Sequence, residues 1–183
     1  LRYLKLNSPT DEILEKIDKF VDEFMREIQY SKLVGYFDIC YTSEGVLLNN
    51  TNVILQGELV ADWLKDCDKI ALVVVTLGIK SEQILAKYQR VSAFDYFVAD
   101  GVATAILEAG VDEVQDGISA NASGLGYGIT SRFSCGYGDF PLETQKDIFR
   151  LLQVEKNIGA HLTDGYMMYP NKTVTAVIGL CKK

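Results

Sequence analysis

Histidine, proline and positive charge are scarce in this sequence. It contains one histidine, His161, and three prolines, and its 18 Lys and Arg residues are outnumbered by 25 Asp and Glu, which gives a net charge of −7. An acidic surface repels nucleic-acid phosphates and anionic lipid headgroups. We therefore expect small molecules and proteins as partners, with no nucleic acid and no membrane.

Cysteine is equally sparse. Cys40, Cys67, Cys135 and Cys181 lie far apart and form no pair with metal-ligand spacing. A zinc site would have to be assembled from scattered residues, and we expect no metal site. Two disulfides are possible, but a core of this size does not require them. Reduced thiols are the simpler interpretation.

Long apolar runs are absent as well. The longest, residues 70–77 (IALVVVTL), is too short to span a bilayer and is rich in β-branched residues, so it predicts a buried strand. The first eight residues carry no apolar stretch of signal-peptide length. We expect a cytoplasmic protein, and its 183 residues with 48% hydrophobic content can form one domain over 1–183.

Apolar periodicity predicts two long helices. Ser8, Pro9 and Asp11 are suited to the start of a helix whose apolar residues repeat at three- and four-residue spacing up to Ile28. A second such helix is expected from Ser92 to about residue 114, followed by a glycine-rich loop over 116–126.

The other segments favour strands and short helices. Antiparallel strands are predicted over 34–41, 46–48 and 51–55, a short helix over 57–65 with Trp63 as a core anchor, and a strand over 128–133. A helix should follow Pro141, and residues 170–172 should join the last two strands as a hairpin. The expected fold class is α+β, with a largely antiparallel sheet covered by long helices.

The strand over 128–133 leads into a turn, Ser131 to Pro141 (SRFSCGYGDFP), that combines an arginine, a tyrosine and two glycines. Glycine allows close approach of a ligand, and the Arg132 guanidinium is suited to a carboxylate or phosphate. The backbone N–H and C=O groups of residues 134–138 can hydrogen-bond to polar edges of a ligand, and the Tyr137 ring can form one wall of the site. This composition fits a binding site, although glycine-rich connections also serve as plain turns.

Glu108 lies inside the apolar stripe of the second long helix, about 20° from Gly101 around the helix axis. A carboxylate there must be paired, protonated or directed into a polar cavity, unless the helix end frays and exposes it to water. Together with Arg132 it would suit a zwitterionic, amino-acid-like ligand. A Cys135–His161 nucleophile and base pair is conceivable, but no orienting partner can be identified.

From Arg132 onward a set of segments follows in order: Arg132 to Pro141 (RFSCGYGDFP), Gln145, Leu151-Leu152, Glu155-Lys156, Ile158-Gly159, Leu162-Thr163, Met168-Tyr169-Pro170 and Thr173-Val174. With these segments the sequence resembles the activation (reactivation) domain of cobalamin-dependent methionine synthase. The resemblance is dense up to about Gly179 and weaker around Glu108.

The resemblance implies a function and a set of site residues. It implies binding of S-adenosylmethionine, which remethylates oxidised cobalamin with an electron from flavodoxin or a similar donor. It assigns the ligand carboxylate to Arg132 and the binding turn to Ser134, Gly136 and Tyr137, and less directly an acidic contact to Glu108. Cobalamin would be supplied by a separate methionine synthase subunit, so the chain would act as a free-standing reactivation subunit. Two alternatives are an adaptor that docks on a corrinoid protein without binding S-adenosylmethionine, and a small-molecule sensor.

Overall fold

The computed structural model describes residues 10–183. Ser8 and Pro9, two of the residues expected to begin the first helix, lie outside the described residues, and the helix itself begins at Asp11. The helices are α1 (Asp11–Glu27), α2 (Glu58–Leu64), α3 (Ile79–Val91), α4 (Ala93–Gly124), α5 (Gln145–Leu151) and α6 (Val154–Ile158), with a 3-10 turn at Leu142–Thr144. The strands are β1 (Ser31–Thr42), β2 (Gly45–Leu48), β3 (Ile54–Leu55), β4 (Cys67–Thr76), β5 (Tyr127–Ile129), β6 (His161–Leu162), β7 (Met168–Tyr169) and β8 (Thr173–Lys182).

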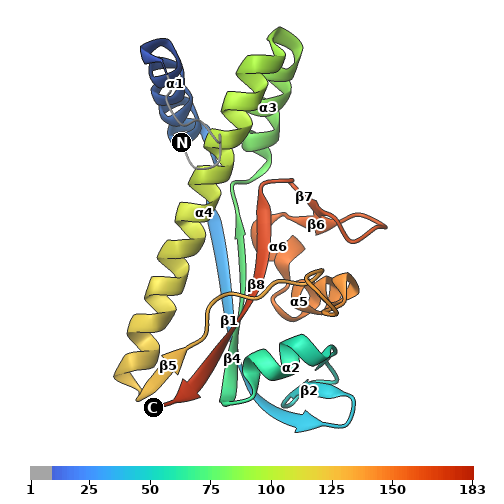
Figure 1. Ribbon diagram of the computed structural model, residues 1–183. Helices are drawn as coiled ribbons and strands as arrows, with labels where there is room; N and C mark the ends of the chain where they lie inside the picture. Colours follow the sequence, from blue (N-terminus) through green and yellow to red (C-terminus); the bar gives the residue numbers. More distant parts are fainter. Residues whose placement is uncertain (1–9) are drawn as a thin grey trace.

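Six strands form one antiparallel sheet in the order β3-β2-β1-β4-β8-β5. Helices cover both of its faces, with α1, α3 and the long α4 on one side and α2, α5 and α6 on the other (Figure 1). This arrangement confirms the predicted α+β fold class.

The central strand β4 explains how the two layers are held together. Its side chains alternate between two cores: Ala71, Val73 and Val75 pack against α1, α3 and α4, while Leu72 and Val74 pack on the opposite side. A strand that is buried on both faces needs a continuous apolar run, and this is the run over 70–77 in the sequence. The predicted buried strand is therefore confirmed.

Two predictions about local structure are wrong. The helix α4 does not end near residue 114 but continues to Gly124, because Val114, Ile118 and Ala122 extend its buried stripe through the glycine-rich segment. The last two strands do not form a hairpin. Strand β7 pairs with β6, whereas β8 lies between β4 and β5 and has neighbours on both edges.

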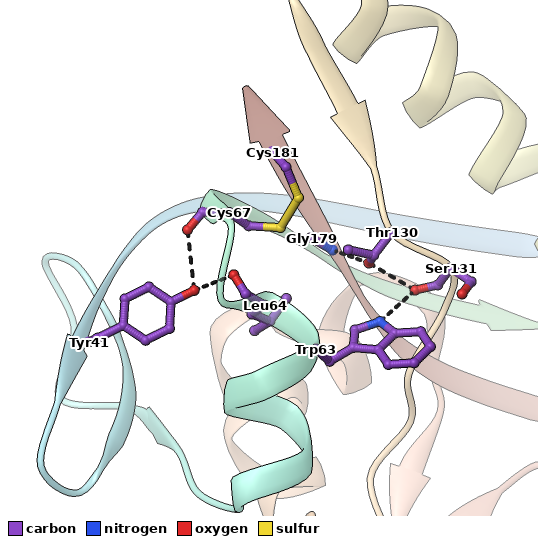
Figure 2. Close-up of a disulfide and its surroundings, with 8 residues drawn as sticks. All are labelled: Tyr41, Trp63, Leu64, Cys67, Thr130, Ser131, Gly179 and Cys181. Carbon is purple, nitrogen blue, oxygen red and sulfur yellow. Dashed lines mark hydrogen bonds between the residues drawn. A yellow bond between two sulfur atoms is a disulfide. The ribbon is translucent and has the colours of Figure 1, made fainter. Parts of the chain in front are cut away.

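The cysteines also differ from expectation. Cys67 and Cys181 form a disulfide (Figure 2), so the prediction of reduced thiols is wrong for this pair. The two residues are partners in the register of β4 and β8, with their Cα atoms 3.9 Å apart. A sequence separation of 114 residues conceals this contact. Cys40 is exposed and Cys135 is buried, and neither is in a disulfide.

Trp63 is at the surface rather than in the core, with 40% of its area exposed. Its indole Nε1 donates a hydrogen bond to the carbonyl oxygen of Ser131 at 3.1 Å (Figure 2), and its ring stacks on Phe133 with centroids 5.4 Å apart. The expectation of a core anchor is therefore wrong. The side chain instead supports the segment that leads from β5 into the turn at 131–141.

Candidate functional site

The turn at 131–141 is held in place from three directions. Phe133 exchanges backbone hydrogen bonds with Val177 of β8. The Asp139 carboxylate accepts bonds from the backbone N–H groups of Glu58 and Leu59, and so caps the N-terminus of α2, which has no side-chain cap of its own. Phe140 is 1% exposed and anchors the end of the turn in the core. These contacts make the turn a rigid support for a binding site.

The backbone inside the turn requires glycine. Gly136 and Gly138 have φ angles of 88° and 59°, in the left-handed region. The N–H of Gly136 donates to the carbonyl of Phe140 at 2.8 Å, which closes the loop. A Cβ atom at Gly138 would clash with Cδ1 of Leu59. Both glycines thus shape the turn.

Arg132 points from this turn toward α4, where it meets two carboxylates. Its Nη2 lies 3.3 Å from Oε2 of Glu108, and its Nη1 lies 2.5 Å from Oδ1 of Asp112. Glu108 therefore lies within reach of the Arg132 turn. Asp112 was missed, although it follows Glu108 by four residues and therefore lies on the same face of the helix.

A cavity of about 430 Å³ opens beside this ion-pair cluster. It lies at the edge of β8 and takes residues from both layers of the fold: Glu108 and Val111 come from α4, whereas Cys135 and Met168 belong to the core on the opposite face. The complete lining is Glu108, Val111, Arg132, Phe133, Ser134, Cys135, Tyr137, Gln145, Met168, Val174, Thr175 and Ala176. A volume in this range suits a small organic ligand.

Four of the five predicted site residues line the cavity: Glu108, Arg132, Ser134 and Tyr137. The Ser134 hydroxyl donates to the carbonyl of Thr175 at 2.7 Å and so ties the turn to β8. Tyr137 is 68% exposed and forms part of the rim. Gly136 does not line the cavity, and it acts through the shape of the turn.

Several lining residues were not predicted as part of the site. Val111 and the β8 residues 174–176 have apolar or small side chains, which carry no sign of ligand contact in a sequence. Gln145 was noted only as part of the family resemblance. No local pattern marks its burial, because that burial depends on how α5 packs on the core.

The structure does not bring Cys135 and His161 to one site. Cys135 lines the cavity beside Arg132, whereas His161 is exposed on β6 and lines a different cavity with Lys146 and Arg150. Burial raises the pKa of the Cys135 thiol to about 12. A thiol with such a pKa is a poor nucleophile near neutral pH, so the geometry gives no support to a cysteine nucleophile.

Cys135 should therefore resist alkylation. At pH 8 a thiol with a pKa of about 12 is roughly one part in ten thousand thiolate. Iodoacetamide treatment of the native protein, followed by peptide mass spectrometry, should label the exposed Cys40 and leave Cys135 unmodified. Labelling of both in denaturant serves as the control. Rapid labelling of Cys135 in the native protein would show that its thiol is activated.

Within residues 10–183, no group of three or more His, Cys, Asp or Glu side chains is placed to hold a metal ion. Among the helices from α1 to α6, none has the length and apolar character needed to cross a membrane.

Comparison with known proteins identifies relatives of this arrangement. A solved structure of the MetH reactivation domain bound to AdoHcy (S-adenosylhomocysteine) matches with a TM-score of 0.71 and 17% identity, over 97% of this chain and 71% of that chain. At this identity the match shows a shared fold. A search of curated proteins found no match. The family model for the activation domain of vitamin B12-dependent methionine synthase matches residues 57–182, which is more than half of the chain. The chain therefore belongs to the family of vitamin B12-dependent methionine synthase activation domains.

Proposed function

We propose that this activation domain binds S-adenosylmethionine in the cavity beside Arg132 and supports the reductive remethylation of oxidised cobalamin on a separate corrinoid protein. The observation that carries the proposal is the placement of Arg132 and Glu108 together at one cavity of about 430 Å³. The bound AdoHcy of the MetH structure supports it, because AdoHcy is S-adenosylmethionine without its transferable methyl group.

The charged pair suits the amino-acid end of such a ligand. The guanidinium of Arg132 can bind the ligand carboxylate with two parallel hydrogen bonds, and Glu108 can accept from the neighbouring ammonium group. The apolar lining, including Val111, Phe133 and Met168, would exclude water from the remainder of the ligand. S-adenosylmethionine would supply the methyl group, and the role of the chain would be to hold and orient it.

Cobalamin and the electron would come from partners. The match to the activation domain of vitamin B12-dependent methionine synthase supports a corrinoid carried by another methionine synthase subunit or domain. Flavodoxin or a similar protein is the proposed electron donor. The turn at 131–141 would face the corrinoid-carrying partner, because Tyr137 is exposed at the rim of the cavity.

One observation favours a second candidate, the adaptor that binds no S-adenosylmethionine. Arg132 already contacts two carboxylates without a ligand, so its charge is balanced within the protein. In the adaptor this cluster would be structural. The contact with Asp112 supports ligand binding, because the Asp112 side chain is 64% exposed and an ion pair so exposed contributes little to stability. A ligand carboxylate can therefore displace Asp112.

Replacement of Asp112 by asparagine should accordingly tighten ligand binding. Removing the competing charge frees Nη1 of Arg132 for the ligand, and we expect about a threefold gain in affinity for S-adenosylmethionine, in line with an exposed ion pair worth roughly 0.6 kcal/mol. Calorimetric titration measures this gain. Asp116→Asn, an exposed carboxylate one turn further along α4, is the control. Weaker binding by the Asp112 variant would favour a structural cluster.

A reconstituted remethylation assay tests the function itself. The protein would be mixed with a cobalamin-carrying methionine synthase module in the cob(II)alamin state, reduced flavodoxin and S-adenosylmethionine, and the absorbance of methylcobalamin would be followed. The proposal expects methylcobalamin to form only when this chain is present. Binding to the corrinoid module without any remethylation would favour the adaptor. Absence of any binding to that module would favour the small-molecule sensor.

A further inference from the structure

Gln145 holds an unsatisfied polar atom at the cavity. The residue begins α5 and is 4% exposed, yet its Oε1 is buried and has no hydrogen-bond partner among the described residues. The only other such atom in this part of the chain is Oδ1 of Asp68, whose second oxygen already accepts from Tyr127. A buried amide oxygen without a partner lowers stability, and a ligand in the neighbouring cavity would supply the missing donor.

The position of Gln145 in the cavity indicates which part of a ligand it would meet. Arg132 and Glu108 define the end on the α4 side of the sheet, where the carboxylate and ammonium of the ligand are proposed to lie. Gln145 begins α5, and Cys135 and Met168 beside it belong to the core on the opposite face. A ligand that spans the edge of β8 would present its far end to Gln145.

We propose that Gln145 recognises the adenine base of the ligand by hydrogen bonds to the exocyclic amino group N6 and the ring nitrogen N7 of the base. This inference rests on the proposed function. A glutamine amide carries a donor beside an acceptor, and this pattern matches the N6 and N7 edge of adenine. Rotation about the terminal torsion of glutamine is soft, so either end of the amide can turn toward the cavity. Met168 provides apolar surface for a face of the ring.

A pair of ligands isolates this contact. S-adenosylhomocysteine carries the amino group, whereas S-inosylhomocysteine carries a carbonyl oxygen in its place and a hydrogen on the ring nitrogen N1. Calorimetric titration of the wild-type protein should show about tenfold or greater preference for S-adenosylhomocysteine, because the inosine oxygen cannot donate to Gln145. In Gln145→Met, which keeps the length and removes the amide, the two affinities should agree within about twofold.

The controls separate this inference from the function on which it rests. Arg132→Ala should weaken both ligands alike and keep the preference, because it acts at the other end of the cavity. Thermal unfolding of Gln145→Met verifies that this variant folds. Gln145→Glu retains an acceptor for the amino group, so this second variant should keep part of the preference for S-adenosylhomocysteine. An unchanged preference in Gln145→Met would overturn the role of Gln145, whereas failure of the wild-type protein to bind either ligand would overturn the proposed function as well.

Discussion

Replacement of Arg132 by alanine is expected to weaken binding of S-adenosylmethionine by about 30-fold or more, which corresponds to roughly 2 kcal/mol. The guanidinium is the cationic group that lines the cavity, with its side chain 27% exposed, and its fork of donors matches a carboxylate. Arg132→Lys should recover only part of the affinity, because an ammonium cannot form the two parallel bonds. Calorimetric titration of the three proteins gives the comparison.

The matched control for this variant is Arg150→Ala. Arg150 is also an arginine in an ion pair, with Asp147 at 2.9 Å, but it lines a different cavity. Its loss should leave the affinity for S-adenosylmethionine unchanged. Equal affinities for wild type and Arg132→Ala would mean that the ligand carboxylate lies elsewhere, and the site would have to be abandoned.

The second large effect concerns stability. Phe140→Ala should lower the free energy of unfolding by about 3–5 kcal/mol, which is the usual cost of deleting a buried aromatic ring. Phe140 is 1% exposed, stacks on Phe133 with centroids 5.8 Å apart, and accepts the hydrogen bond that closes the turn at 131–141. Denaturant unfolding, read by circular dichroism, measures the loss.

Met167→Ala provides the comparison for the Phe140 variant. Met167 is 62% exposed, so its truncation should change the free energy of unfolding by no more than about 0.5 kcal/mol. Because Phe140 holds the turn from which Arg132 projects, its variant should also bind S-adenosylmethionine more weakly where it remains folded. A loss of less than about 1 kcal/mol would show that the turn has no anchor in the core.

The apolar pattern of the sequence predicts much of the fold. The apolar repeat up to Ile28 predicted α1, and the continuous run over 70–77 predicted β4, because each pattern is a direct result of burial on one or two faces. The sequence predicts an α4 helix that is too short, because glycine favours a loop after residue 114. In the structure the buried residues Ile118 and Ala122 continue the helix. Packing against the sheet outweighed the weak helix propensity of Gly117.

Long-range pairing could not be predicted from local pattern. The strand β8 has the composition of a hairpin strand, but its partners β4 and β5 lie far away in the sequence, and β7 pairs with β6 instead. The disulfide between Cys67 and Cys181 depends on the same pairing of β4 with β8. Only the register of the sheet brings such residues together.

Some residues of the candidate site can be predicted from the sequence, and others cannot. Arg132 and Tyr137 could be selected from the composition of one turn, and Glu108 from its position in an apolar stripe, which is a local anomaly. Asp112 lies one turn beyond Glu108 on the same face of α4, but its side chain is 64% exposed and takes part only because Arg132 reaches it. Gln145 takes part through an unmet hydrogen bond, which is a property of the folded interior.

The most direct test of the proposed binding site is a calorimetric titration of the wild-type protein with S-adenosylhomocysteine. Every other role proposed for this chain depends on ligand binding at this cavity. We predict saturable binding of one ligand per chain, weakened about 30-fold or more on replacement of Arg132 by alanine. Absence of heat at millimolar ligand, with a cobalamin-carrying partner present and the protein shown to be folded, would contradict it.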